Sequence, residues 1–247
     1  MKTQVWAHRG ASAYAPENTL EAFKLAAGQG ADGVELDVQL SRDNELVVAH
    51  DETIDRVSNG SGYIKDHTLG ELKKLRFNRL FPEYRDAAIP TLREVYELLK
   101  PTGLVINVEL KTGIVPYEGI EERALYLASE MGMDNRVIYS SFHHPSLVKL
   151  KILDSSVKTG LLYSDGWIDV ASYGRYTVRA DALHPALYHM QDKELIPSAR
   201  SLGLALHVWT VDDEAYMEAL IRQGVEAIIT DKPDMCRNVA DRLNPFG

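Results

Sequence analysis

Short apolar runs alternate with longer segments of helical spacing along most of this chain. The first unit shows the pattern: residues 5–8 form an apolar run, residues 20–27 have the spacing of a helix, and residues 34–40 form a second apolar run. Runs of four to eight apolar and β-branched residues are typical of buried strands, whereas a 3.6-residue period indicates an amphipathic helix. Continued to the end of the chain, the pattern predicts eight strands, at 5–8, 34–40, 104–110, 137–142, 159–163, 182–184, 205–211 and 227–230.

Helices are predicted between these strands, at 91–99, 117–131, 145–153, 167–173, 193–202, 214–223 and 233–242. Strands that alternate with helices form parallel sheets with crossover connections. Eight such units in 247 residues fit a closed barrel better than an open doubly wound sheet. No glycine-rich dinucleotide loop follows any strand, which also disfavours a Rossmann fold. We therefore predict a TIM (β/α)₈ barrel, with residues 1–247 as a single domain.

One segment, residues 51–90, interrupts the alternation. It contains the turn Asn59-Gly60-Ser61-Gly62 and one short helical pattern at 68–75. This stretch is too short for an independent domain, so we interpret it as an insertion after the second barrel strand. Insertions of this kind commonly lie over the mouth of a scaffold and shape its binding site.

Composition and charge exclude several classes of function. The chain carries a net charge of −9 with 45% hydrophobic and 26% charged residues, which argues against a nucleic-acid partner or an anionic membrane surface. Its one cysteine, Cys236, excludes an internal disulfide and a cysteine metal cluster. No stretch is apolar enough for a signal peptide or a membrane span. We expect a cytoplasmic protein without stable membrane insertion, and the sequence leaves open a homo-oligomer.

Acidic residues stand at the ends of two neighbouring predicted strands. Glu35 and Asp37 are two residues apart, so they share one face of their strand. Glu109 and Lys111 have the same spacing on the next strand. Three carboxylates without cysteine suit a hard divalent cation, Mg²⁺ or Ca²⁺, better than Zn²⁺. The alternative is a network of ion pairs with Arg9 and Lys111, and these two cations would also suit a phosphate group.

Two histidines lie beside these acids, since His8 ends the first strand and His50 follows the run at 46–48. Imidazole has a pKa near ~6.5, so a pair of histidines can supply both an acid and a base near neutrality. Phe142 and Trp209 also stand at strand ends, where pocket lining and barrel packing are about equally expected. Asp231 is expected to cap the last helix. The other histidines are expected to be ordinary core or surface residues: His67, His143, His144, His184, His189 and His207.

Short motifs stand in a fixed order at or near the ends of the predicted strands. They are His8-Arg9-Gly10, Pro16-Glu17-Asn18-Thr19, Glu35-Leu36-Asp37-Val38-Gln39, Val48-Ala49-His50-Asp51, Glu109-Leu110-Lys111, Ser141-Phe142, Trp209-Thr210 and Thr230-Asp231-Lys232-Pro233. This ordered set resembles the glycerophosphodiester phosphodiesterase family, and the resemblance covers essentially the whole chain.

The resemblance implies a TIM barrel that hydrolyses glycerophosphodiesters to an alcohol and glycerol 3-phosphate. It also implies that His8 and His50 act as acid and base. The residues that would hold one divalent cation are Glu35, Asp37 and Glu109, and those that would bind the phosphate are Arg9 and Lys111.

Two other functions stay open at this point. One is a related barrel phosphodiesterase that acts on lysophospholipid or phosphoinositide head groups, and the other is a non-catalytic barrel that binds phosphorylated ligands. For the hydrolase, we expect the substrate's own glycerol hydroxyl to attack phosphorus, since it is tethered at high effective concentration. Direct attack by water requires the same residues, so both routes stay open.

Overall fold

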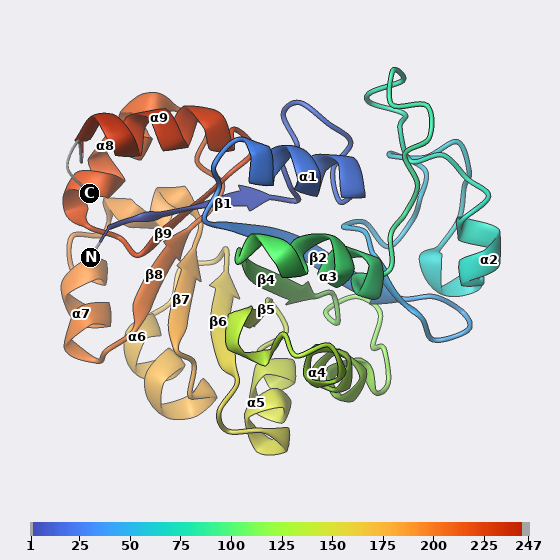
Figure 1. The fold of residues 1–247 in the computed structure, drawn as a ribbon. Coiled ribbons are helices and arrows are strands. Elements are labelled where there is room, and N and C mark those ends of the chain that lie inside the picture. Colours follow the sequence, from blue (N-terminus) through green and yellow to red (C-terminus); the bar gives the residue numbers. More distant parts are fainter. Residues whose placement is uncertain (1, 244–247) are drawn as a thin grey trace.

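The chain forms a closed barrel of parallel strands in a computed structural model that describes residues 2–243. The barrel is drawn in Figure 1, with helices on its outside. Its eight strands are β1 (Gln4–His8), β2 (Gly33–Leu40), β4 (Val105–Leu110), β5 (Val137–Ser141), β6 (Lys158–Tyr163), β7 (Ala182–Pro185), β8 (Ala205–Val208) and β9 (Ala227–Thr230). The predicted TIM barrel is confirmed.

The order of the strands places the candidate site residues side by side. Each of these eight strands pairs in parallel with the next barrel strand along the chain, and β1 closes the ring by pairing with both β9 and β2. In this register His8 of β1 lies beside Glu35 of β2, and Asp37 lies beside Glu109 of β4. The remaining strand, β3 (Leu46–Val48), runs antiparallel to β2 outside the barrel.

The helices follow the predicted alternation, and several begin at side-chain caps. Thr19 caps the first helix, and Thr91 and Glu94 form a reciprocal capping box at the start of the helix that precedes β4. The main helices are α1 (Leu20–Gly28), α3 (Leu92–Leu99), α4 (Ile120–Glu130), α5 (His144–Leu153), α6 (Val170–Ser172), α7 (Leu195–Ser201), α8 (Glu214–Gln223) and α9 (Pro233–Leu243).

The helix predicted at 167–173 is the least accurate of these predictions. Residues 164–169 form a loop, and α6 begins at Val170. Asp169 is the N-cap residue of this helix, and its side chain accepts a hydrogen bond from the backbone N–H of Ser172. The helix then continues as a π-helical stretch, Tyr173–Val178. Short 3₁₀ turns complete the connections, at Ile64–Asp66, Lys100–Thr102, Asp134–Arg136 and Leu187–Gln191.

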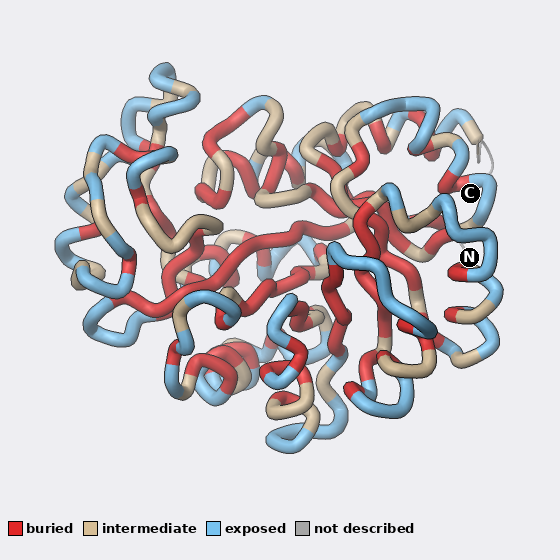
Figure 2. Tube along the Cα trace, turned by 180° about the vertical axis from the view of Figure 1, so that it is seen from behind, coloured by how far each residue is buried: buried red, intermediate tan, exposed pale blue. Residues whose placement is uncertain are grey.

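Most of the core lies between the strands and the surrounding helices. In Figure 2 the strands are buried along nearly their whole length, whereas the helices bury one side. Every residue of β2 is buried, including the polar residues Glu35, Asp37 and Gln39. Buried charges require a partner or a metal. The buried acidic residues of β2 therefore indicate that this strand contributes to a functional site.

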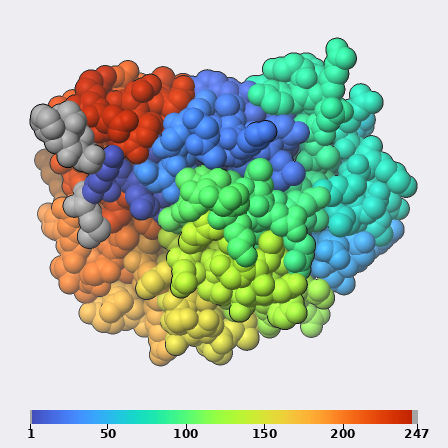
Figure 3. All heavy atoms as spheres, viewed as in Figure 1, coloured from blue at the N-terminus to red at the C-terminus, as the bar shows by residue number. Residues whose placement is uncertain are grey.

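The insertion lies between β3 and α3 and has an apolar cluster of its own. Ile54, Ile64, Leu72 and Phe77 are buried together there. Its only α-helix among the described residues is α2 (Leu69–Leu72), shorter than the predicted 68–75. Figure 3 shows the insertion, in the cyan to green colours of residues 51–90, as a projection beside the barrel. That residues 1–247 form one domain stays a prediction.

The helices found in residues 2–243 are too short or too polar to span a bilayer. The cytoplasmic location stays a prediction.

Candidate functional site

Three buried carboxylates converge at the carboxyl ends of β2 and β4. Glu35 and Asp37 share the inner face of β2, and the parallel register puts Glu109 next to Asp37. One oxygen from each carboxylate lies within 4.8 Å of the others. All three side chains are buried, with residue exposures of 4%, 1% and 7%. The arrangement offers oxygen ligands only, which is the donor set that Mg²⁺ and Ca²⁺ prefer.

Two cations lie against the carboxylates without neutralising all of them. Lys111 Nζ lies 2.9 Å from Glu109 Oε1 and 3.7 Å from Asp37 Oδ1. Arg9 Nε lies 3.4 Å from Asp37 Oδ2. Among the described residues, Asp37 Oδ1 is buried and has no hydrogen-bond partner. A bound cation would satisfy this oxygen, so the site fits a divalent metal ion.

The carboxylates also differ in how they titrate. Burial, and then the nearby charge of Asp37, raises the pKa of Glu35 to about 8. Burial acts in the same direction on Asp37, but Arg9 and Lys111 outweigh it and hold the pKa of that carboxyl well below its usual range. A divalent cation among these oxygens would stabilise the ionised form of Glu35 and so oppose both effects that raise its pKa, burial and the charge of Asp37.

His8 is held by a carboxylate from the opposite end of the chain. Its Nδ1 lies 2.7 Å from Asp231 Oδ1, and Ser12 Oγ donates a second hydrogen bond to the same oxygen at 2.9 Å. Burial lowers the pKa of His8, but the bond to Asp231 and the charge of Glu35 outweigh it and raise this pKa above its usual value. The expectation that Asp231 merely caps the last helix is therefore wrong, because its carboxylate contacts His8.

His50 has the same arrangement, built from the neighbouring residue. Its Nδ1 lies 2.6 Å from Asp51 Oδ1, and Arg56 Nε donates to the other carboxylate oxygen of Asp51 at 2.6 Å. Arg56 also donates two hydrogen bonds to Glu17, which in turn accepts one from Arg9 Nη1 at 2.9 Å. Both histidines thus have Nδ1 engaged by a carboxylate, which leaves Nε2 for a ligand.

A narrow pocket of about 50 Å³ is lined by both histidines and by two of the carboxylates, Glu35 and Glu109. Phe142 and Trp209 form its apolar side, with ring centroids 5.5 Å apart and planes at 89°. Asn107, Leu162 and Ile229 also line it. A second pocket, of about 170 Å³, shares Glu109 and Phe142 with the first. Every residue that the sequence predicts for the site lines one of these two pockets, with the exception of Asp37.

The other buried histidines and the cysteine lie outside these two pockets. His184 and His207 are hydrogen-bonded to each other at 2.8 Å inside the barrel, and Trp6 packs against the ring of His207. Cys236 is a buried thiol of α9. His184 and His207 are buried residues of the barrel interior, in agreement with the expectation that they are ordinary core residues.

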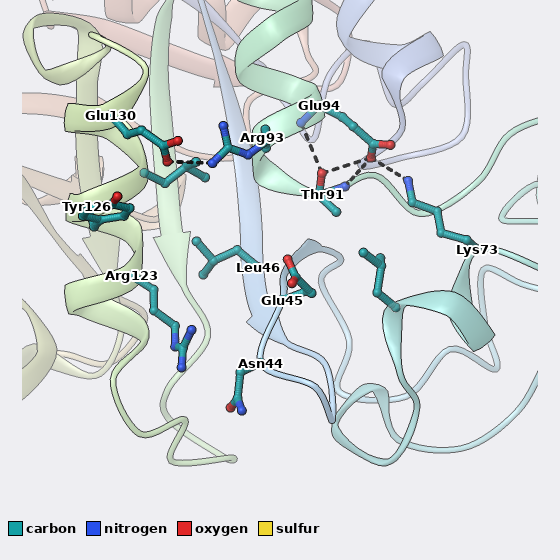
Figure 4. Close-up of a pocket in the computed structure, with 12 residues that line it drawn as sticks. Asn44, Glu45, Leu46, Lys73, Thr91, Arg93, Glu94, Arg123, Tyr126 and Glu130 are labelled. Atoms are coloured by element: carbon teal, nitrogen blue, oxygen red, sulfur yellow. Dashed lines mark hydrogen bonds and ion pairs between the residues drawn. The ribbon is translucent and has the colours of Figure 1, made fainter.

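A wider groove of about 440 Å³ lies between the insertion and helices α3 and α4, as shown in Figure 4. Its charged side chains mostly satisfy one another. Arg93 pairs with Glu130 at 2.6 Å, and Lys73 pairs with Glu94 at 2.5 Å. Among the described residues, no group of three or more metal-ligating side chains lies in this groove, so it is a weaker candidate than the barrel mouth.

Sequence reasoning missed the residues that hold the site residues in place. Asn18 Nδ2 donates to Asp37 at 2.9 Å, while Glu17, Asp51, Arg56 and Asp231 hold Arg9 and the two histidines. Four of these five lie within the motifs on which the family resemblance rests. The motifs signalled that these residues matter, but not which side chain each one contacts.

Comparisons with known proteins agree with this geometry. Residues 8–235 match the glycerophosphoryl diester phosphodiesterase family. A curated glycerophosphodiester phosphodiesterase of Caldanaerobacter subterraneus subsp. tengcongensis is 45% identical over 240 residues, which cover 97% of this chain and 98% of the relative.

Solved structures give the same result. That of an Oleispira antarctica phosphodiesterase in complex with the product sn-glycerol-3-phosphate has a TM-score of 0.86 at 32% identity, covering 97% of both chains. The glycerophosphodiester phosphodiesterase of Agrobacterium tumefaciens has a TM-score of 0.83 at 29% identity, covering 96% of this chain and 99% of that one. This chain belongs to the glycerophosphoryl diester phosphodiesterase family.

Proposed function

We propose that this chain hydrolyses glycerophosphodiesters to an alcohol and glycerol 3-phosphate, with His8 and His50 as the acid and base. Family membership supports the reaction, and the relative from Oleispira antarctica was solved with the product sn-glycerol-3-phosphate. The observation that carries the assignment of the histidines is their shared environment. Each has Nδ1 bound to a carboxylate, and both line one pocket above a buried acidic cluster.

Glu35, Asp37 and Glu109 would hold one divalent cation, Mg²⁺ or Ca²⁺. Their burial, their spacing and the absence, among the described residues, of a hydrogen-bond partner for Asp37 Oδ1 support this assignment. When bound, such a cation supplies positive charge that stabilises the negative charge developing on the substrate oxygens. It also compensates three acidic groups that Arg9 and Lys111 balance only in part.

Arg9 and Lys111 would bind the phosphate. Both side chains are largely buried beside the carboxylates, and the surrounding acids raise their pKa values, so both stay charged. The Arg9 guanidinium offers a forked set of donors, and Lys111 offers a compact point charge. Together they would stabilise the charge that gathers on the phosphate oxygens during displacement.

The two histidines would divide the proton transfers. One takes the proton from the glycerol hydroxyl next to the ester as that hydroxyl attacks phosphorus, and the other donates a proton to the leaving alcohol. Water then opens the cyclic glycerol phosphate, and the histidines exchange roles. Phe142 and Trp209 would hold the carbon chain of the glycerol, because they form the apolar side of the narrow pocket.

The direct test is a hydrolysis assay with a panel of glycerophosphodiesters that follows release of glycerol 3-phosphate. We expect release from several members of the panel in the presence of Mg²⁺ or Ca²⁺. Failure to hydrolyse any member with either cation, by a folded protein, would contradict the proposed function.

A further inference from the structure

The second pocket at the barrel mouth has a character of its own. It shares Glu109 and Phe142 with the narrow pocket, and it extends past Lys111 toward Ile114 and Glu52. At about 170 Å³ it is the roomier of the two. A diester whose phosphate lies against Lys111 and whose glycerol fills the narrow pocket would place its second alcohol here.

Glu52 brings a charge to this pocket that no neighbour neutralises. Its backbone is fixed, because the Glu52 carbonyl accepts a hydrogen bond from Ile64 N at 2.9 Å and Thr53 forms a bridge with Tyr63. In the part of the chain that the structure describes, its carboxylate forms neither an ion pair nor a hydrogen bond, unlike Glu17 and Asp51 nearby. A half-buried carboxylate in a binding pocket without a partner favours a cationic ligand.

The other charged groups of the pocket do not neutralise the negative charge of the Glu52 carboxylate. Lys111 is engaged by Glu109 at 2.9 Å and by Asp37 at 3.7 Å, and in the proposed reaction it binds the phosphate. His143 lies at the edge of the pocket, where its Nδ1 contacts Ser146 Oγ at 3.2 Å. Phe142 adds an aromatic ring that is 42% exposed, so part of it is free to meet a ligand.

We propose that this pocket is the subsite for the leaving alcohol, and that Glu52 selects substrates whose alcohol carries an amine or quaternary ammonium group. The inference rests on the proposed diester hydrolysis. In ethanolamine and choline esters the nitrogen lies two carbons beyond the ester oxygen, which brings the cation from the phosphate toward Glu52. The ring of Phe142 adds cation–π attraction on the same side.

An acyl chain is the competing occupant, because Ile114 is 74% exposed next to Phe142. A chain laid along these residues would remove water from the carboxylate of Glu52 without giving it a partner. Such desolvation is unfavourable. The unpaired charge therefore favours the amine over the acyl chain.

The test compares kcat/KM of the cation-loaded enzyme for three substrates: glycerophosphoethanolamine, glycerophosphocholine and glycerophosphoglycerol, whose leaving alcohol is uncharged. Glu52→Gln should lower kcat/KM for the two cationic substrates by about three- to fivefold, the size expected for a partly exposed ion pair. It should leave glycerophosphoglycerol nearly unchanged. Glu52→Lys should reverse the preference, and added salt should reduce the selectivity of the wild type.

A matched control is Glu83→Gln, which removes an equal charge from an exposed position of the same insertion that lines neither pocket. It should leave all three substrates unaffected. Equal losses on cationic and uncharged substrates in Glu52→Gln would overturn the inference, as would a preference for lysophosphatidylglycerol, whose leaving alcohol is an acylated glycerol without an amine. A wild-type protein that hydrolyses none of the substrates would instead overturn the proposed function.

Discussion

Two pairs of histidines lie in this barrel, and their surroundings differ. His8 and His50 line the pocket at the strand ends, and each has Nδ1 bound to a carboxylate. His184 and His207 lie inside the barrel, bound to each other at 2.8 Å. Burial lowers the pKa of His207 to about 3 and that of His184 well below its usual value, whereas the pKa of His8 is raised.

The difference teaches what turns a buried histidine into a candidate catalyst. A carboxylate on Nδ1 fixes the ring and stabilises its protonated form, so Nε2 can both accept and donate a proton. A second histidine on the ring offers no negative charge, and burial then keeps both rings neutral. We therefore expect the first pair to matter for turnover and the second for stability.

The largest effect should follow removal of an imidazole from the first pair. His8→Ala and His50→Ala should each lower kcat by about 10²–10⁴, the usual contribution of a general acid or base. Circular dichroism and thermal unfolding should show that both variants stay folded. Activity within a few-fold of the wild type in either variant would exclude that histidine as acid or base.

A substrate analogue tests which nucleophile the first pair serves. Replacing the glycerol hydroxyl next to the ester by hydrogen removes the tethered attacking group. We expect hydrolysis to slow by about a hundredfold or more, because an intramolecular nucleophile has a high effective concentration. Hydrolysis of the analogue at near the normal rate would show that water attacks directly.

A smaller effect should follow removal of the carboxylate that holds His8. The bond to Asp231 raises the pKa of His8, so Asp231→Asn should lower that pKa and move the pH–rate limb of His8 to lower pH. We expect kcat to fall by about tenfold or more, since outer carboxylates of this kind typically contribute 10–100-fold. An unchanged pH profile with reduced thermal stability would assign Asp231 a structural role only.

The smallest effect on turnover should come from the second pair. His207→Leu leaves His184 Nε2 without a partner, so we expect a loss of about 1–3 kcal/mol in the free energy of unfolding. Turnover should stay within a few-fold of the wild type when measured below the unfolding transition. A large loss of kcat in a folded His207→Leu protein would break the distinction between the two pairs.

Much of the fold and the acidic cluster could be predicted because local patterns encode them. The alternation of runs predicts the eight strands, and the spacing of Glu35 and Asp37 places both carboxylates on one face. The weakest prediction, the helix at 167–173, concerned a segment in which the helix begins only at Val170. Tertiary context overrides a weak pattern there.

The partners of the site residues could not be predicted, because closure of the barrel creates them. Asp231 reaches His8 across 223 positions in the sequence, and this contact exists only because β9 pairs with β1. Arg56 likewise donates hydrogen bonds to both Glu17 and Asp51, which lie in two different loops. Periodicity carries no information on such contacts, whereas the ordered motifs mark the residues without giving their geometry.

The central claim is that three buried carboxylates hold a cation on which the chemistry depends. The most direct measurement strips the protein with a chelator and then follows hydrolysis and cation binding as Mg²⁺ or Ca²⁺ is added back. The account predicts that activity disappears, returns with added cation, and requires more cation in Glu109→Gln, which loses one ligand but stays folded. Hydrolysis that persists at its normal rate in the stripped protein would contradict the account.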